Sequence, residues 1–206
     1  MCGKLIIISG FSGSGKGTIV KEIFKRSNDF CLSISATTRS MRKGEREGVS
    51  YFFVTKDKFE EMIKNNELLE FAKYIDNYYG TPKKYVLDRL NEGKNVILEI
   101  EIQGALQIKK ICKDSILIFI IPPNAKALYD RLKKRGTETD EMIESRLKKA
   151  IVEAEDIKNY DYVLVNDNID NVINDFFKIL SDEYKNSIDV DVIINKILSD
   201  IKNNYY

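Results

Sequence analysis

Short apolar runs recur along the chain, separated by longer segments in which apolar residues return every three or four positions. Runs of four to six residues are typical of strands that are buried on both faces of a parallel sheet. Five such strands are expected, and the second has the least regular pattern. They lie at residues 5–9, 31–36, 96–101, 116–121 and 162–165.

The segments between these runs have the period of amphipathic helices. The first helix follows a glycine-rich loop, and its apolar face comprises Ile19, Val20, Ile23 and Phe24. Further helices are expected at residues 83–91 and 124–136, and after Thr139, whose residue type often caps helix N-termini. Strands that alternate with helices predict an α/β fold with a parallel sheet flanked by helices.

Residues 37–79 interrupt this alternation. They are rich in charged and aromatic side chains, and they contain strand-like pieces at 51–54 and 69–74 around a helix that starts near Lys56. We interpret this region as a small mixed α+β lobe inserted between two strands of the main sheet.

We expect all of these parts to belong to one domain. Residues 133–143 are dense in charge and contain no expected strand, so they predict a helical flap. The tail after Tyr184 has a helical pattern to which we assign no function. The expected boundaries are a core at 1–36, 83–124 and 148–185, the inserted lobe at 37–82, a lid at 125–147 and a helical tail at 186–206.

The composition limits the chemistry that this chain can perform. Its 206 residues include 33 Lys and Arg against 32 Asp and Glu, a balance that gives no reason to expect nucleic acid or an anionic membrane as a partner. The absence of histidine excludes a Ser-His-Asp triad and an imidazole metal site. The three cysteines lack the spacing of zinc sites or disulfide frameworks. Because no stretch approaches the ~20 apolar residues that span a bilayer, a cytoplasmic location is expected.

A glycine-rich loop joins the first expected strand to the first expected helix, with the sequence GFSGSGKGT at residues 10–18. This is the context of a phosphate-binding loop, in which backbone N–H groups, a helix N-terminus and a lysine bind phosphate oxygens. A glycine-rich turn that binds nothing is the alternative, but the spacing, the lysine and the flanking elements all disfavour it. The candidate binding residues are Ser12, Gly13, Ser14, Gly15, Lys16, Gly17 and Thr18.

Gly17 departs from the usual motif, which places Ser or Thr directly after the lysine so that its hydroxyl contacts Mg²⁺. Thr18 follows one position later. The Gly-Lys-Gly-Thr variant resembles nucleoside monophosphate kinases. It also makes water-mediated binding of Mg²⁺ the preferred interpretation.

Arg39 and Arg42 lie three residues apart in the expected lobe. At this spacing two guanidinium groups can bind one phosphate from two sides, and the hydroxyls of Tyr51 and Tyr79 are further donors. Considered alone, the segment would be interpreted as a solvated basic turn, because charge runs are usually solvated.

Several blocks of sequence reverse that preference, because together they strongly resemble guanylate kinases. The blocks are SATTR at 35–39, GVSYFF at 48–53, LEFA at 69–72, NYYGTP at 77–82, EIEIQG at 99–104, RGTET at 135–139 and VND at 165–167. They follow one another in the family's order from about Lys4 to Tyr184. Met41 stands where the family often has proline, a difference that removes no chemical group.

The resemblance implies transfer of the ATP γ-phosphoryl group to GMP. It implies the same transfer to dGMP if no residue contacts the ribose 2′-hydroxyl. The implied fold is a P-loop core with a GMP-binding lobe and a closing lid. The implied GMP-binding residues are Ser35, Arg39, Arg42, Tyr51, Glu70, Tyr79, Gly80, Thr81 and Glu101. The implied ATP-binding residues are those of the loop at 12–18 together with Arg131, which could equally be a surface residue, and Asn166. The implied catalytic residues are Lys16, Arg39, Arg135 and Arg146, of which the last two are lid arginines.

The chemistry of the base supports this acceptor independently. Guanine has N1–H and N2–H₂ donors beside an O6 acceptor, so a carboxylate such as Glu70 and a hydroxyl such as that of Ser35 or Thr81 suit it. Adenine has the reverse pattern, and mismatches of this kind can change discrimination by ~10⁴. The alternative is that Glu70 is an ordinary surface acid at the end of a strand.

Glu99 and Glu101 lie two residues apart in the strand expected at 96–101, so their side chains would share one face. The resemblance assigns Glu101 to guanine, and we assign Glu99 to Mg²⁺ through water. A hydrolase with paired carboxylates is the rival interpretation, which the phosphate loop disfavours.

Two other functions are weighed against GMP kinase activity. A kinase for another nucleotide would have to use an acceptor other than AMP, because Glu70 and Ser35 argue against adenine. A guanylate-kinase-like interaction module would bind phosphopeptides, but such modules typically have a degraded phosphate loop, whereas Lys16 is present here. The expected partners are therefore ATP with Mg²⁺, and GMP, and the expected assembly is a monomer or a homodimer.

Overall fold

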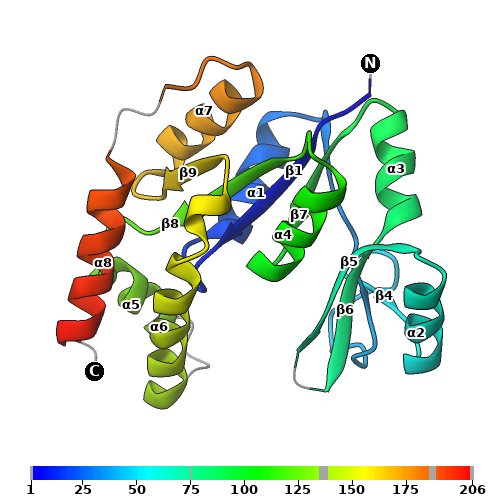
Figure 1. Ribbon diagram of the computed structural model, residues 1–206, viewed down its shortest axis with the longest axis horizontal. Helices are drawn as coiled ribbons and strands as arrows, with labels where there is room; N and C mark the ends of the chain where they lie inside the picture. Colours follow the sequence, from blue (N-terminus) through cyan, green and yellow to red (C-terminus); the bar gives the residue numbers. More distant parts are fainter. Residues whose placement is uncertain (1, 75, 135–138, 186–188, 205–206) are drawn as a thin grey trace. The chain divides into compact units, whose positions relative to one another are not determined.

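The computed structural model describes residues 2–74, 76–134, 139–185 and 189–204. Its contacts divide the chain into two compact units, and Figure 1 labels the α-helices and most of the strands. The first unit comprises Met1–Ile7 and Ser27–Ile116, and the second comprises Ile8–Arg26 and Leu117–Tyr206. Strand β1 (Leu5–Gly10) therefore contributes residues to both units.

A five-stranded sheet has the strand order β2-β7-β1-β8-β9. In the first unit β2 (Phe30–Leu32) pairs in parallel with β7 (Asn95–Glu99), with Cys31 opposite Val96. The amide of Val96 also donates to the carbonyl of Lys4, just before β1 begins. The three central residues of β7 are fully buried, as expected for a strand that is covered on both faces.

Two helices of the first unit pack on its strands. Helix α3 (Lys83–Asn91), which the sequence predicts, contacts β7, and α4 (Ile102–Ile111), which it does not predict, contacts β5. The strand expected at residues 96–101 is too long, because β7 ends at Glu99. Glu101 is instead the N-cap residue of α4.

The second sheet of the first unit has the strand order β4-β3-β6-β5. The bounds are Phe52–Phe53 for β4, Ala36–Thr37 for β3, Asn77–Pro82 for β6 and Leu68–Tyr74 for β5. Strand β3 runs parallel to β4 and antiparallel to β6, and β5 pairs with β6 as an antiparallel hairpin. Helix α2 (Lys56–Lys64) buries Phe59, whose ring stacks on Tyr78 at a centroid distance of 5.2 Å. The expected strand pieces around a helix near Lys56 are therefore present.

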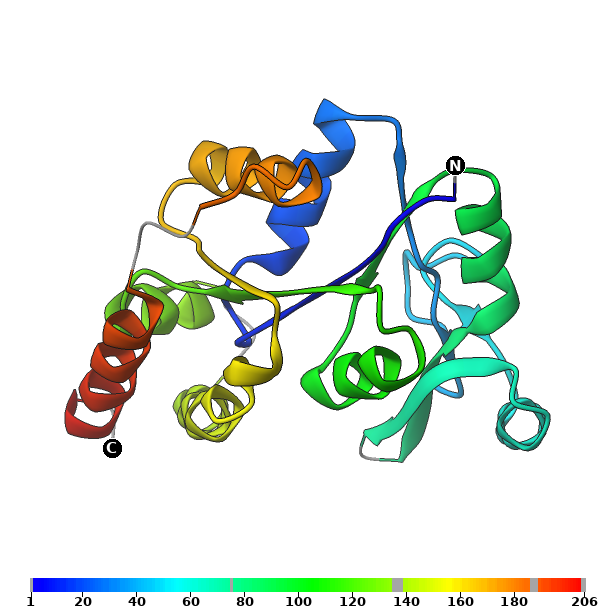
Figure 2. The same ribbon diagram turned by 45° about the horizontal axis from the view of Figure 1, so that its top comes forward.

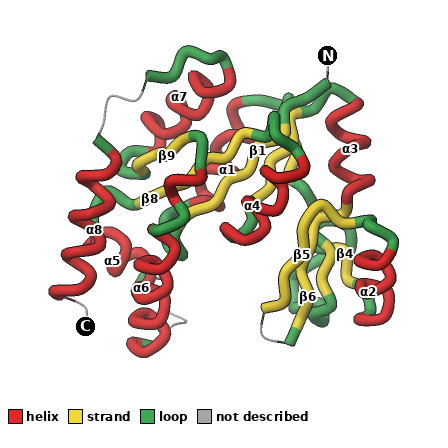
Figure 3. Tube along the Cα trace, in the orientation of Figure 1, coloured by secondary structure: helices red, strands yellow, loops and turns green. Residues whose placement is uncertain are grey.

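The strand expected at residues 31–36 is wrong as a single element. Its first part belongs to β2 in the five-stranded sheet, whereas Ala36 begins β3 in the four-stranded sheet. Apolar and polar residues alternate through this stretch and fit a strand locally, but the chain passes from one sheet to the other within it. Figure 3 shows strands β4, β5 and β6 of the four-stranded sheet beside helix α2.

In the second unit the end of β1 neighbours β8 (Ile116–Ile121), which pairs in parallel with β9 (Tyr162–Val165). All but the first residue of β8 are fully buried and form the centre of this core. Helix α1 (Lys16–Arg26) packs beside α7 (Ile169–Leu180) on one side of these strands, and α6 (Asp140–Ala154) lies on the other (Figure 2). The predicted α/β fold is confirmed.

The remaining helices complete the second unit. Helix α5 (Ala125–Lys133) precedes α6, whose first turn is capped by the Thr139 hydroxyl as predicted. A short 3₁₀ helix (Ile157–Asn159) precedes β9, and α8 (Val190–Asn204) forms the helix that the tail pattern predicts. Helix α8 packs against α5 and α6 through Ile194, Ile197 and Ile201. No helix in the described part of the chain is both long enough and apolar enough to cross a membrane.

Candidate active site

The phosphate loop of the second unit lies between the end of β1 at Gly10 and the start of α1 at Lys16, as predicted. Gly13 and Gly15 have φ angles of 91° and 98°, a left-handed conformation that disfavours side chains. A Cβ on Gly15 would also lie 2.3 Å from the amide nitrogen of Asn166. The loop conformation therefore requires these glycines.

Lys16 folds back over the loop. Its Nζ donates to the carbonyl of Gly10 at 2.6 Å and to that of Phe11 at 3.2 Å. These two bonds hold the ammonium group beside the first residues of the loop. Thr18 lies exposed on the first turn of α1, and Gly17 carries no side chain. The usual hydroxyl ligand for Mg²⁺ directly after the lysine is therefore missing.

Arg131 and Asn166 both hold the carbonyl of Ser14. The Asn166 amide donates to this oxygen at 2.7 Å and Nη1 of Arg131 donates to it at 3.2 Å, while Nη2 of Arg131 donates to the carbonyl of Asn166 at 2.8 Å. Burial lowers the pKa of Arg131. The structure thus joins two residues that the sequence assigns to ATP, and it joins them through the loop backbone.

The Oγ of Ser14 is itself buried, and no hydrogen-bond partner for it lies within the described ranges. Buried polar atoms without partners are uncommon and are often found at functional sites. A second arginine contacts the same loop, because Arg146 on α6 donates to the hydroxyl of Ser12. Arg135, the other predicted lid arginine, lies outside the described residues.

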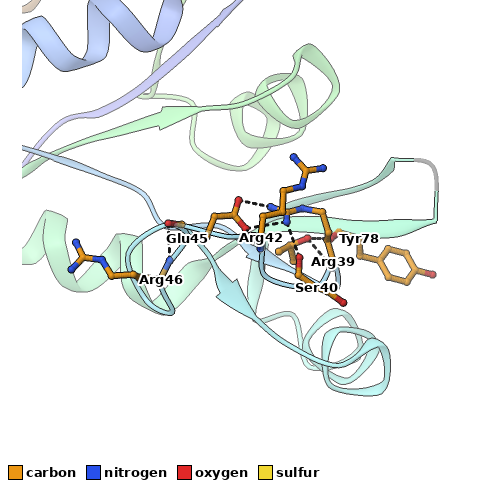
Figure 4. Close-up of polar contacts among 8 residues, drawn as sticks. Arg39, Ser40, Arg42, Glu45, Arg46 and Tyr78 are labelled. Carbon is orange, nitrogen blue, oxygen red and sulfur yellow. Dashed lines mark hydrogen bonds and ion pairs between the residues drawn. The ribbon is translucent and has the colours of Figure 1, made fainter. Parts of the chain in front are cut away.

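In the first unit Arg39 forms a bidentate ion pair with Glu45, in which Nη1 and Nη2 each donate to one carboxylate oxygen (Figure 4). The guanidinium also lies over the rings of Tyr51 and Phe53, at 5.4 and 5.9 Å from their centroids. The side chain of Arg39 is only 12% exposed. The pair raises the pKa of Arg39 and lowers that of the Glu45 carboxyl, so both groups carry charge.

The other predicted phosphate-binding residues lie close to this pair. The ring of Tyr51 meets that of Tyr79 edge to face, with centroids 6.1 Å apart. Burial, followed by the neighbouring Tyr79, raises the pKa of Tyr51, so its hydroxyl stays protonated and can donate. Arg42 reaches the group through its backbone amide, which donates to Glu45 at 2.7 Å. The basic turn is therefore ordered by internal contacts.

Glu70 on β5 is 6% exposed, which excludes the interpretation of it as a surface acid. Its carboxylate accepts a 2.6 Å hydrogen bond from the hydroxyl of Thr81 on β6. Burial raises the pKa of Glu70, and the bond from Thr81 opposes this shift. A Cβ on Gly104 would lie 2.6 Å from Oε2 of Glu70, so the first turn of α4 makes room for this carboxylate.

Four more predicted residues lie in the first unit. Ser35 is half-buried just before β3, and Gly80 is buried on β6, where a Cβ would meet the carbonyl of Glu70 at 2.8 Å. Glu99 and Glu101 are both exposed. The expectation that these two acids share a strand face is wrong, because β7 ends at Glu99 and Glu101 is the N-cap residue of α4.

No group of three or more His, Cys, Asp and Glu residues that could hold a metal ion occurs in the ranges that the structure describes. The exposed carboxylate of Glu99 at the end of β7 suits a hydrated ion.

Two residues of the site are not predicted from the sequence as site residues. Glu45 lies in a charge-rich turn in which no single acid stands out, although it follows Arg39 by six positions and Arg42 by three. Gly104 is part of a recognised block, but its role depends on the approach of α4 to Glu70. Only spatial contacts identify both.

One family model and several known proteins similar to this chain are described as guanylate kinases. The family model described as "Guanylate kinase" matches residues 2–183. A guanylate kinase of Clostridium tetani is 50% identical over 181 residues, which is 88% of this chain and 86% of that protein, and one of Bacillus subtilis is 52% identical over 169 residues, 82% and 83% of the two chains. The crystal structure of guanylate kinase from Anaplasma phagocytophilum is similar with a TM-score of 0.69 and 31% identity, and the match covers 90% of this chain and 88% of that one.

Proposed function

This chain belongs to the guanylate kinase family, and we propose that GMP binds to the residues described in its first unit and ATP to the phosphate loop of its second. The family reaction transfers the γ-phosphoryl group of ATP to GMP and yields ADP and GDP. The chain is accordingly an ATP:GMP phosphotransferase. We propose dGMP as a second acceptor, because the groups assigned to GMP act on its base and its phosphate.

The observation that supports GMP most directly is the buried carboxylate of Glu70. When ionised, it accepts hydrogen bonds from N1–H and N2–H₂ of guanine, whereas adenine would turn an acceptor toward it. The hydroxyl of Thr81 already donates its proton to Glu70, so it has none for O6 of guanine. We therefore assign O6 to the hydroxyl of Ser35 and leave Glu101 as a second guanine acceptor.

The phosphate of GMP is assigned to Arg39, Arg42, Tyr51 and Tyr79. Two guanidinium groups on one turn provide charge-assisted donors, the guanidinium of Arg39 lies over the ring of Tyr51, and the hydroxyl of Tyr79 interacts with Arg39. Gly80 is assigned to the GMP site on the side of the base, because it lets β6 approach β5 closely beside Glu70. This division separates the residues that bind the base from those that bind the phosphate.

The phosphates of ATP are assigned to the loop at 12–18. Left-handed glycines turn the loop backbone, the N-terminus of α1 adds partial positive charge, and Lys16 provides a full one. Arg131 and Asn166 support this site through the carbonyl of Ser14. The contact of Arg146 with Ser12 supports a role for that arginine beside the phosphates.

We propose that Mg²⁺ accompanies ATP and that Glu99 holds it through water. Gly17 offers no hydroxyl and Glu99 is exposed, a donor set that fits a hydrated ion carried by the nucleotide phosphates. When bound, the ion neutralises phosphate charge.

Positioning and charge neutralisation account for the chemistry assigned to this chain. A phosphate oxygen of GMP is already anionic, so no protein nucleophile or general base is required. Lys16, Arg39 and Arg146 would stabilise negative charge that spreads over the transferred group, and Arg135 is proposed to act with them. A closed lid would also exclude water, which competes with GMP as acceptor.

We keep residues 37–82 as the proposed GMP-binding lobe and 125–147 as the proposed lid. A monomer or homodimer and a cytoplasmic place of action also remain proposals, the latter because both substrates are nucleotides of central metabolism. Phosphopeptide binding by a catalytically inactive module is disfavoured by Lys16 and its contacts with the loop.

An ADP-release assay with different acceptors tests this function. With ATP and Mg²⁺, we expect kcat/KM for GMP to exceed that for AMP, CMP or UMP by a factor of about 10³ or more. A reaction without acceptor measures hydrolysis. Comparable rates with AMP and GMP would contradict the assignment of Glu70 to guanine.

A further inference from the structure

Glu45 joins the two arginines of the basic turn. Its Oε1 accepts from Nη2 of Arg39 at 2.8 Å, and its Oε2 accepts from Nη1 of Arg39 at 3.0 Å. The same Oε2 also accepts from the backbone amide of Arg42 at 2.7 Å (Figure 4). One carboxylate therefore fixes the side chain of one arginine and the backbone of the other.

The hydrogen-bond donors of Arg39 are only partly used by these contacts. A guanidinium group has five N–H donors arranged in a plane, and pairs of them form edges that match a carboxylate or a phosphate. Nη1 uses both of its donors, one on Glu45 and one on the carbonyl of Ser40 at 2.7 Å, and Nη2 uses one on Glu45. These three bonds do not use Nε–H or the second N–H of Nη2, which form the other edge of the group, and the hydroxyl of Tyr79 also interacts with Arg39.

The environment of Arg39 favours a second anion at that edge. The hydroxyl of Tyr79 lies close enough to contribute to the raised pKa of Arg39, and the guanidinium is held against the ring of Tyr51. With a side chain that is 12% exposed, Arg39 has little room to turn. A phosphate can therefore bind without displacing Glu45, because the two anions use different edges.

We propose that Glu45 is a positioning residue for the GMP phosphate. By occupying one edge of Arg39 it directs the other edge toward the phosphate, and by holding the amide of Arg42 it keeps the second arginine on the same turn. This inference rests on the proposed function and adds to it a residue that does not itself touch the nucleotide. The opposite possibility is that the carboxylate occupies the place of the phosphate and must leave before GMP binds.

Calorimetry with GMP and with guanosine separates these possibilities. For Glu45→Ala we expect GMP to bind about tenfold more weakly or worse, because Arg39 loses its orienting partner, while guanosine binding stays within about twofold of the wild type. KM for ATP should not change. Glu45→Gln keeps the shape of the side chain and should give a smaller loss. Glu60→Ala, which removes an exposed acid from α2 of the same unit, is the charge control and should have no effect.

A double-mutant cycle shows whether Glu45 acts through Arg39. In an Arg39→Ala background, Glu45→Ala should weaken GMP binding clearly less than it does in the wild type, because only the contact with the backbone amide of Arg42 is left to lose. Tighter GMP binding by Glu45→Ala would overturn the inference in favour of competition. An equal loss for GMP and guanosine would overturn it in favour of a general structural role. If the wild-type chain fails to bind GMP, the proposed function fails instead.

If Glu45→Ala does not fold, Glu45→Gln carries the same comparison. Its GMP and guanosine affinities then decide the matter, with thermal unfolding as the check on folding. Unchanged GMP affinity in this variant, with a measurable loss of stability, would also contradict the positioning role.

Discussion

The hydroxyl of Thr81 donates a 2.6 Å hydrogen bond to the carboxylate of Glu70, and both side chains are buried. Antiparallel strands β5 and β6 bring them together, and Gly104 on α4 leaves space beside the acid. The hydroxyl and the backbone of Thr81 both bond to this buried carboxylate, but an ionised acid can accept more bonds than Thr81 provides. The N1–H and N2–H₂ groups of guanine are donors of the kind that this acid can still accept, which supports the proposed assignment of Glu70 to the base.

Replacing Thr81 with valine should weaken GMP recognition while keeping the volume of the side chain. The buried carboxylate would lose its partner, and its pKa would rise further above the usual range for glutamate. We expect kcat/KM for GMP to fall about tenfold, whereas KM for ATP stays the same. Steady-state kinetics with each substrate varied in turn measures both. Thr81→Ser keeps the hydroxyl and should restore most of the activity.

Glu70 should also contribute less to the stability of the protein at neutral pH than in acid. Because burial raises its folded-state pKa above the unfolded value, its contribution to stability is fully present below the unfolded pKa and is lost as the pH rises through the folded pKa. Glu70→Gln should therefore increase Tm by about 2–4 °C at pH 7.5 and by much less near pH 4. Thermal unfolding at the two pH values measures the difference, and an equal Tm change at both would argue against this titration.

The same titration predicts a pH dependence of guanosine binding. Only the ionised carboxylate accepts from both guanine donors, so affinity should fall as the pH drops through the raised pKa of Glu70. Guanosine is the better probe, because the phosphate of GMP itself titrates near pH 6. Calorimetry between pH 5 and 8 should show this loss of guanosine affinity at low pH in the wild type. If the same loss persists in Glu70→Gln, the titrating group is not Glu70.

Lys16→Ala should abolish turnover and leave GMP binding unchanged. The lysine charge is held at the phosphate loop by the carbonyls of Gly10 and Phe11, whereas the residues that we assign to GMP belong to the first unit. We expect a loss of at least about 10³ in kcat, with the Kd for GMP within about twofold of the wild type. Lys25→Ala, at the exposed end of α1, is the matched control and should remain active. Loss of GMP binding in a folded Lys16 variant would contradict this division.

Asn166→Asp should impair ATP use selectively. The amide of Asn166 donates to the carbonyl of Ser14, and a carboxylate in its place would face that oxygen with an acceptor. We expect KM for ATP to rise about tenfold and KM for GMP to stay constant. Asn168→Ala is the control: it removes the cap of α7, which should cost about 1 kcal/mol of stability without a change in KM for ATP.

The sequence predicts the fold best where local pattern and tertiary structure agree. The expected strands at 116–121 and 162–165 coincide with β8 and β9, because continuous apolar runs of this length suit buried parallel strands. The alternation in Glu99-Ile100-Glu101 also fits a strand, yet the chain turns into α4 there. That turn brings Gly104 against Glu70, a tertiary contact that local pattern does not contain.

The candidate site divides in the same way. Lys16 and the loop glycines are predicted because a phosphate loop is contiguous in sequence. Glu45 is not predicted as a site residue, because its proposed role depends on its contact with the guanidinium group of Arg39, which the sequence does not show. The link from Asn166 to Ser14 spans 152 positions, so the sequence assigns Asn166 to ATP without indicating that it holds the loop.

A competition experiment tests the central claim most directly. ATP labelled in its γ-phosphoryl group is mixed with Mg²⁺, the protein, and GMP, AMP, CMP and UMP at equal concentrations, and the labelled products are separated. We predict that the label appears almost entirely in GDP, and that Lys16→Ala transfers none. Label in ADP made from AMP, or released mainly as inorganic phosphate, would contradict the account.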